Sequence, residues 1–177
     1  MRKKSGVPLV ESFTSPLYLH GLQGLCSHLN LTSPPSAPRL TEKDLALVVF
    51  KTIAVLDKYC GKGAPHQQAL TKFPMRVFED LAVNGSLHCV LETVLQQPPS
   101  FLDSMLQGVP EGVVEEGLVV FGQVDSNLRD RGFLHHPKVF FGSTVPREII
   151  PELRNIVSKH KGEIVKAESV ATHIIEW

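Results

Sequence analysis

The sequence predicts an α+β fold in which a long helical segment is followed by a short α/β segment. Apolar residues recur at helical spacing through most of the first 136 of the 177 residues. Runs of β-branched and aromatic residues bounded by turn signals follow, between residues 137 and 177. We therefore divide the chain into an N-terminal helix with a Pro-rich linker (1–40), a helical segment (41–136) and an α/β segment (137–177).

The first predicted helix begins at Ser15-Pro16, because proline is well tolerated in the first turn of a helix. It ends before the turn-rich residues 31–39, which we interpret as a linker. The apolar face of this helix consists of Leu17, Leu22, Leu25 and Leu29.

A second helix is predicted from Thr41, which caps it, to Gly61, which ends it. Glu42 and Asp44 lie in its first turn, where acidic side chains interact favourably with the helix dipole. Its core-facing stripe consists of Leu45, Val49, Ile53 and Leu56.

Two further helices are predicted before residue 137. Residues 73–81 fit a short helix or a strand equally well. The turn-forming residues Asn84, Gly85 and Ser86 follow, and a helix is predicted after them. Residues 96–112 are rich in Pro and Gly and are predicted to form a surface loop. A last helix then ends at 129–132. The apolar positions of the two helices are Leu87, Val90, Leu91 and Leu95, and Val114, Leu118, Phe121, Val124 and Leu128.

The α/β segment reads as a strand at 139–141, a helix, and strands at 163–165 and 171–175. The helix is predicted to start at Pro146 and to end at Gly162 in the left-handed conformation. A strand, helix and strand within about thirty residues is the size of a parallel crossover unit. The apolar stripe of the helix consists of Ile149, Ile150, Leu153, Ile156 and Val157.

These residues resemble the first half of a BRCT domain. The resemblance depends on FFGS at the end of the first strand, Lys161-Gly162 after the helix, and ATHII at 171–175. Such domains continue with a second helix, a fourth strand and a third helix carrying a Trp, a role that Trp177 does not fit. The resemblance therefore implies a fragment of a longer protein, with one sheet face and one edge uncovered. The predicted interaction surface comprises Val139, Phe141, Ile164, Ile174 and Ile175.

The preceding residues extend the resemblance over roughly 12–177. The pattern F-P-x-x-x-F-x-D at 73–80, the stretch 85–91 and the ATHII end are similar to the amino-terminal module of the SMARCC scaffold subunits of SWI/SNF chromatin remodellers. In that family a MarR-like winged-helix segment, here 41–136, precedes a BRCT segment, and the wing would fall within 96–112. The resemblance implies a non-catalytic scaffold in the nucleus that contacts other remodeller subunits or chromatin.

Charge is unevenly distributed although the net charge is zero. Residues 1–40 contain four basic residues (Lys or Arg) and one acidic residue (Asp or Glu). Residues 41–136 contain eight basic and twelve acidic residues, and residues 137–177 contain six basic and five acidic residues. A net acidic helical segment favours contacts with protein over DNA. The alternative is a sequence-nonspecific DNA-binding winged helix that uses Arg129, Arg131 and Lys138. A MarR-like ligand sensor, which needs a pocket and a dimer, is a third hypothesis.

Residues with reactive side chains do not form a recognisable catalytic or metal-binding motif. Cys60, His66, His88 and Cys89 lack the spacing of a zinc site, and His135-His136 is interpreted as a turn at the segment boundary. Ser143 or Thr144 is predicted to cap the following helix rather than bind phosphate. We therefore predict no enzyme activity, no cofactor and no small-molecule substrate.

Composition further predicts where the chain resides. The three cysteines are odd in number and widely spaced, which favours reduced, buried thiols. The sequence holds no apolar run long enough to cross a membrane and no secretory signal, so we expect an intracellular protein without membrane contact.

Overall fold

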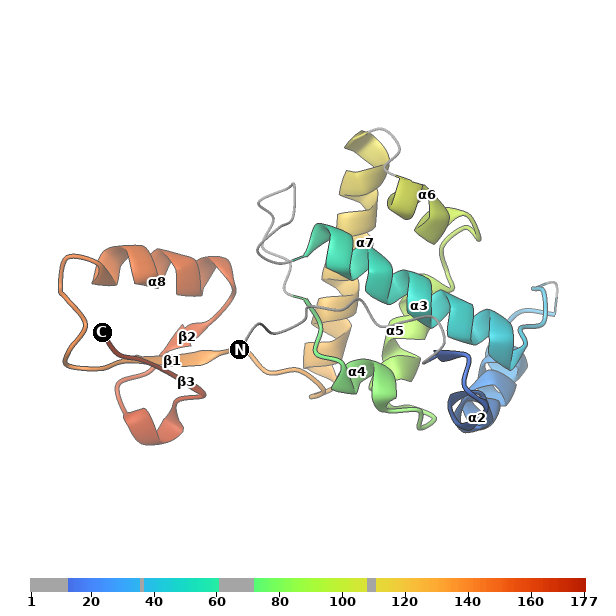
Figure 1. The fold of residues 1–177 in the computed structure, drawn as a ribbon, viewed down its shortest axis with the longest axis horizontal. Helices are drawn as coiled ribbons and strands as arrows, with labels where there is room; N and C mark the ends of the chain where they lie inside the picture. Colours follow the sequence, from blue (N-terminus) through green and yellow to red (C-terminus); the bar gives the residue numbers. More distant parts are fainter. Residues whose placement is uncertain (1–12, 36, 61–71, 108–110) are drawn as a thin grey trace.

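The computed structural model describes residues 13–35, 37–60, 72–107 and 111–177, and of residues 111–114 the backbone alone. The described residues form seven α-helices, a short 3₁₀ helix and a three-stranded sheet, which confirms the mixed α+β class. Figure 1 shows the elements in two groups, which we call the helical body (described residues of 13–134) and the α/β unit (138–177). The elements are α2 Pro16–Thr32, α3 Glu42–Tyr59, α4 Arg76–Glu79, α5 Ser86–Val94, α6 Phe101–Gln107, α7 Glu111–Asp130, β1 Lys138–Phe141, α8 Ile150–Lys159, β2 Glu163–Ile164, η1 Glu168–Val170 and β3 His173–Ile175.

The first two helices begin where capping residues predict. The Ser15 hydroxyl accepts a hydrogen bond from the Tyr18 N–H at the start of α2. Thr41 and Asp44 form a reciprocal capping box at the start of α3. Leu17 is 83% exposed, so its predicted place on the apolar face is wrong. Five residues separate it from Leu22, which turns the two side chains about 140° apart around the helix axis.

Residues 73–107 differ from the sequence interpretation in one important respect. The ambiguous stretch contains the short helix α4, but the predicted surface loop contains α6. Leu102 and Met105 of α6 are buried, and α6 packs against both α3 and α7. Prolines and glycines flank this helix and suggested a loop, whereas its apolar residues stabilise it through contacts with distant helices.

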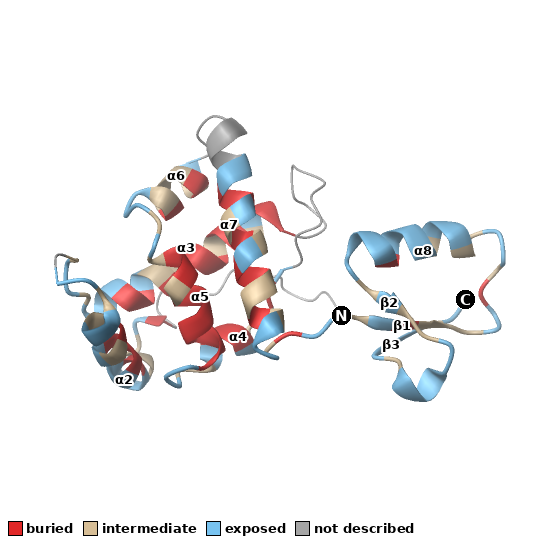
Figure 2. Cartoon of the chain, turned by 180° about the vertical axis from the view of Figure 1, so that it is seen from behind, coloured by how far each residue is buried: buried red, intermediate tan, exposed pale blue. Residues whose placement is uncertain are grey.

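Helix α7 closes the core of the helical body, as its apolar stripe predicts. Leu118, Phe121, Val124 and Leu128 are all buried, and the side chain of Val114 lies outside the described residues. Figure 2 shows buried positions along α7 between exposed ones. The helix is followed by Gly132 in the left-handed region, at φ 77°. One continuous cluster of buried apolar side chains extends from Phe13 to Leu134, so α2 shares a core with the residues after position 40.

The three strands of the α/β unit are parallel, in the order β2-β1-β3. Helix α8 connects β1 to β2, which confirms the predicted parallel crossover. The chain then passes through η1 to β3 on the other side of β1 (Figure 1). Each outer strand pairs with β1 alone among the described residues.

Three details around α8 correct the sequence interpretation. The helix begins at Ile150 rather than Pro146, whose carbonyl instead accepts the Ile149 N–H in a turn. Thr144 does not cap the helix, because its hydroxyl accepts a hydrogen bond from the backbone N–H of the C-terminal residue. The left-handed residue after the helix is Lys161, at φ 55°, and not Gly162.

Gly162 is required for a different reason. A Cβ at this position would lie 2.7 Å from Val157 Cγ1 and 3.1 Å from Pro137 Cγ. The glycine therefore allows the backbone to pass closely under α8 on its way into β2.

Candidate functional site

The predicted interaction surface of the α/β unit divides between the two faces of its sheet. Directly paired residues of parallel strands lie on the same face, and successive residues alternate between faces. Val139 pairs with Ile164 and Phe141 with Ile175, so these four share a face. Ile174 pairs with Phe140 and lies on the opposite face.

Burial separates these residues further. Val139 is only 5% exposed, as is expected beneath the crossover helix, and is therefore part of the interior rather than a free surface. Phe141, Ile164 and Ile175 are half-buried, and Ile174 is 48% exposed. Other large apolar side chains exposed on the α/β unit are Ile156, Val170 and Trp177.

The three predicted DNA-contacting residues are not brought together. Arg129 donates from Nε and Nη2 to the Asp125 carboxylate at 2.9 and 3.0 Å. Arg131 pairs with Glu92, with 2.7 Å between Nη2 and Oε2, and lines a different cavity from Arg129. Lys138 is exposed on β1 and lines neither cavity. Two of the three positive charges are thus already paired within the protein.

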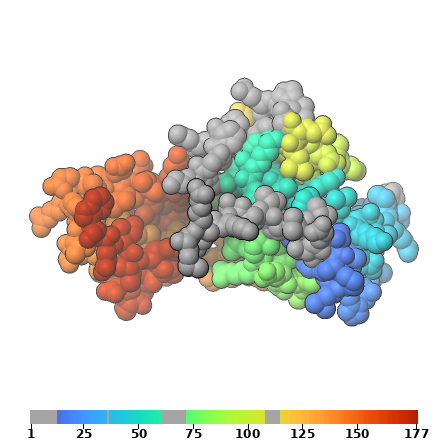
Figure 3. All heavy atoms as spheres, viewed as in Figure 1, coloured from blue at the N-terminus to red at the C-terminus, as the bar shows by residue number. Residues whose placement is uncertain are grey.

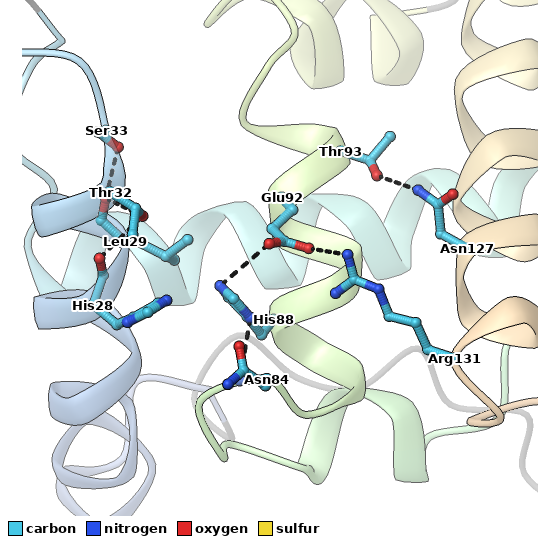
Figure 4. A network of polar contacts seen from close by, with 10 residues as sticks. All are labelled: His28, Leu29, Thr32, Ser33, Asn84, His88, Glu92, Thr93, Asn127 and Arg131. Atoms are coloured by element: carbon cyan, nitrogen blue, oxygen red, sulfur yellow. Dashed lines mark hydrogen bonds and ion pairs between the residues drawn. The ribbon is translucent and has the colours of Figure 1, made fainter.

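The Arg131–Glu92 pair belongs to a polar network that joins three parts of the helical body (Figure 4). The other Glu92 carboxylate oxygen lies 3.8 Å from Nε2 of His88, and Nδ1 of His88 accepts the Asn84 N–H at 3.2 Å. The His28 ring of α2 contacts the His88 ring edge-on, with 5.0 Å between centroids. Burial lowers the pKa of His88, which is only 2% exposed, and so favours the neutral imidazole.

Asp80, the last residue of the F-P-x-x-x-F-x-D pattern, forms hydrogen bonds at the start of α5. Its carboxylate accepts hydrogen bonds from the N–H of Ser86 at 2.7 Å and from the hydroxyl of Ser86 at 3.3 Å, at the start of α5. A Cβ at Gly85 would lie 2.6 Å from the same carboxylate oxygens, so glycine is required there. Phe73 and Phe78 are buried in the core. The pattern therefore fixes the entry into α5.

A cavity of about 410 Å³ lies at the junction between the helical body and the α/β unit, and we call it the junction cavity. Figure 3 shows the α/β unit, coloured orange to red, as a lobe beside the helical body. His135 and His136 line the cavity from the connection between the two. The turn predicted at these histidines lies earlier, at residues 131–132, and the histidines themselves are not in a turn. Further lining residues are Lys72, Phe73, Pro74, Arg76, Asp125, Arg129, Leu134, Pro137, His160, Thr172 and His173.

The described residues include no group of three or more side chains placed to hold a metal ion, and His66 lies outside them. Cys26, Cys60 and Cys89 are buried and unpaired, in agreement with the predicted thiols. Burial raises the pKa of Cys60 to about 11, so that thiol is protonated at neutral pH. In the part of the chain that the structure describes, no helix has the length and apolar character needed to span a membrane.

Comparison with protein families identifies the first half of the chain. Residues 2–98 match the model of the SWIRM-associated domain at the N-terminal, which covers more than half of the chain. This match includes α2 to α5, and α6, α7 and the α/β unit lie beyond it. The domain occurs in subunits of SWI/SNF-type chromatin-remodelling complexes. The chain therefore belongs to the family of proteins that carry a SWIRM-associated domain at the N-terminus.

Proposed function

We propose that this chain is a non-catalytic scaffold module of a SWI/SNF-type remodelling complex, of the SMARCC kind. The observation that carries the proposal is the match of residues 2–98 to the SWIRM-associated domain. The role implies residence in the nucleus, contacts with other remodeller subunits or chromatin, and a contribution to transcription regulation. It requires no cofactor and no small-molecule substrate.

The proposal includes a BRCT-like origin for the α/β unit and a MarR-like origin for the helical body. Support for the first is the parallel β1-α8-β2 crossover with β3 on the far side of β1. The second is supported by the sequence resemblance alone. The described residues of the helical body contain no strand, and the segment expected to hold a wing contains α6.

Within this role, we assign partner contacts to the α/β unit. Ile174, Val170 and Trp177 are large apolar side chains that are 48, 53 and 78% exposed. The outer edges of β2 and β3 have no strand partner among the described residues. Exposed apolar side chains and open strand edges are both features that a protein partner covers.

The DNA-binding alternative has less support. Arg129 is held by Asp125 in a largely buried pair, and releasing it for a phosphate would leave that carboxylate unpaired. Arg131 pairs with Glu92 at the surface, where the pair contributes less. Nonspecific DNA binding gives affinity that falls steeply with salt. Strong binding to duplex DNA at low salt, lost as the salt concentration rises, would favour this alternative.

The scaffold role can be tested by recovering tagged chain from nuclear extract after nuclease treatment, with mass spectrometry of the bound proteins. We expect remodeller subunits to be recovered with the native sequence. Ile174→Asp should reduce this recovery, because it places a charge on the exposed sheet face. The matched control is Ser158→Asp, which adds the same charge at an exposed position of α8.

Three results are informative. Loss of recovery with Ile174→Asp alone supports the assignment of contacts to the sheet. Equal recovery with both variants leaves the scaffold role intact and contradicts the assigned surface. Recovery of no remodeller subunit with any folded form of the chain would rule out the scaffold proposal.

A further inference from the structure

The junction cavity contains groups that the proposed scaffold role does not use. Its walls come from both bodies: Phe73 precedes α4, Arg76 begins it, and Arg129 lies in the last turn of α7. His160 and His173 belong to the α/β unit. An occupant would therefore contact both bodies at once. Its volume of about 410 Å³ lies within the range of sites that hold small ligands or parts of larger ones.

The cationic groups of the cavity retain unused binding capacity. Nη1 of Arg129 is buried and has no hydrogen-bond partner among the described residues, although Nε and Nη2 of the same side chain are bound to Asp125. The side chain of Arg76 is exposed and forms no hydrogen bond or ion pair with a described residue. Lys72 is paired with Asp57.

The charge balance of the lining follows from these pairs. Asp125 is the acidic residue of the lining, and its carboxylate is occupied by Arg129. Apart from the charges that are paired within the protein, the lining contains the positive charge of Arg76 and the unpaired Nη1 donor of Arg129. A buried donor without a partner is unfavourable, and an acceptor oxygen from a ligand would relieve that cost.

Four histidines add hydrogen-bonding groups around the same space: His135, His136, His160 and His173. Nδ1 of His173 is already hydrogen-bonded to the Thr172 hydroxyl at 2.8 Å, which leaves its Nε2 for a ligand. A neutral imidazole offers one N–H donor and a protonated one offers two. The four do not form a metal-binding group among the described residues. Their donors, together with the guanidinium groups, favour a ligand that supplies oxygen acceptors and negative charge.

We propose that the junction cavity binds an oxyanionic group, a carboxylate or a phosphate, carried by a protein segment. Arginine is suited to both groups because its planar guanidinium binds two oxygens at once. Phe73, Pro74 and Leu134 give the cavity apolar walls that suit the neighbouring side chains of a peptide. A DNA duplex would instead need a row of exposed cations along its backbone, and Arg131 lines a separate cavity.

The bound segment would also hold the α/β unit against the helical body. Arg76 lies on the helical side of the cavity, and His160 and Thr172 lie on the α/β side. Contacts with both sides reduce the relative motion of the two bodies. Binding in the cavity involves only residues of this chain, whether or not the chain assembles into a remodelling complex.

The test is fluorescence anisotropy with the full chain and three labelled peptides of equal length: a glutamate-rich peptide, a neutral peptide with one phosphoserine, and a glutamine-rich control. We expect one or both anionic peptides to bind, and the glutamine-rich peptide to bind at least tenfold more weakly. Arg76→Gln should weaken anionic binding about tenfold, the effect of losing one charge-assisted hydrogen bond. Arg154→Gln is the matched control, because it removes the same charge at an exposed position of α8 outside the cavity.

NMR of the amide groups identifies the place of binding. Signals of His136 and Thr172 should shift on addition of the anionic peptide, since both residues line the cavity. Preference for one of the two anionic peptides shows which oxyanion is bound. The proposal is overturned if neither peptide binds, if Arg154→Gln weakens binding as much as Arg76→Gln, or if a single-stranded oligonucleotide binds more tightly than both peptides.

Discussion

The helical body and the α/β unit differ in how far each one covers its own apolar residues. In the helical body a single cluster of buried side chains joins six helices, and Phe121, Leu91 and Leu45 are almost inaccessible. In the α/β unit the buried apolar residues among those described are Val139, Val145 and Val157. Burial of apolar area is the main favourable contribution to folding. We therefore expect the helical body to be the more stable part and the α/β unit to gain more from a partner.

The same difference in coverage separates buried from exposed apolar residues that have the same spacing in the sequence. Leu118 and Ile156 both belong to an apolar stripe on an amphipathic helix, yet Leu118 is 4% exposed and Ile156 is 48% exposed. Helix α7 packs against α5 and α6, whereas α8 contacts β2 and is otherwise open on its outer side. An apolar stripe predicts which face of a helix can be buried. The elements that pack against that face determine how much of its surface is actually buried.

The largest expected effect is in the core of the helical body. Phe121→Ala should reduce the free energy of unfolding by about 3–5 kcal/mol, because it leaves a cavity beside Phe101 and removes buried apolar area. Urea unfolding followed by circular dichroism measures the loss. Val119→Ala on the same helix is the control, since Val119 is 73% exposed and should change stability by no more than about 0.5 kcal/mol. Similar losses in both variants would contradict the described core.

The next largest effect concerns the entry into α5. Asp80→Ala removes the acceptor for the Ser86 N–H and hydroxyl and should cost about 1–3 kcal/mol. The same urea measurement applies, with Glu116→Ala as a control that removes an exposed carboxylate from α7. An Asp80→Ala variant as stable as the control would show that the F-P-x-x-x-F-x-D pattern is not maintained by this contact.

A smaller and more local effect is expected in the α/β unit. Val157→Ala should cost about 1–2 kcal/mol, because it removes two carbon atoms from one of the three buried apolar side chains that the structure describes in the α/β unit. Amide hydrogen exchange should show faster exchange in β1 and β3 and no change in α5. Equal acceleration in both bodies would mean that the chain unfolds as one cooperative unit, and the comparison between the two would then be wrong.

The smallest effect is a dependence of stability on pH. The pKa of His88 is lowered by burial, so the unfolded chain binds a proton more readily than the folded one. Stability is therefore complete above the ordinary histidine pKa of about 6.5 and falls as the pH decreases below it. Urea midpoints at pH 7.5 and 5.5 should differ less for His88→Gln than for the native chain.

The control for this experiment is His136→Gln, which changes an exposed imidazole. If His88→Gln and His136→Gln both have the same pH dependence as the native chain, groups other than His88 govern acid stability.

Local signals predicted much of the helical body. Ser15 and Thr41 mark helix starts through hydrogen bonds to residues three positions ahead, and such contacts depend on adjacent sequence alone. The stripe at Leu45, Val49, Ile53 and Leu56 is buried as its spacing predicts. The parallel crossover of the α/β unit was predictable for a similar reason, because its strands and helix follow one another within about thirty residues.

The errors arose where distant contacts outweigh local signals. Helix α6 lies in a Pro- and Gly-rich stretch and is stabilised by α3 and α7, far away in the sequence. The role of Asp80 depends on the close approach of Gly85, which no spacing rule indicates. In the candidate sites, the alternative hypothesis used Arg129, Arg131 and Lys138 to contact DNA, but Arg129 and Arg131 form ion pairs and line different cavities.

By itself, the sequence determined the class of fold, the starts of the first two helices, the strand-helix-strand order after residue 137 and the relation to chromatin-remodelling subunits. These depend on side-chain spacing, capping and sequence pattern, which are local properties. The tertiary structure alone decided that α2 shares the core of the later helices, that Val139 is interior while Ile174 is exposed, and that Arg76, Arg129 and four histidines surround one cavity. The burial of a side chain and the assembly of a cavity from several side chains depend on which elements pack together. Packing brings together residues that are far apart in the chain.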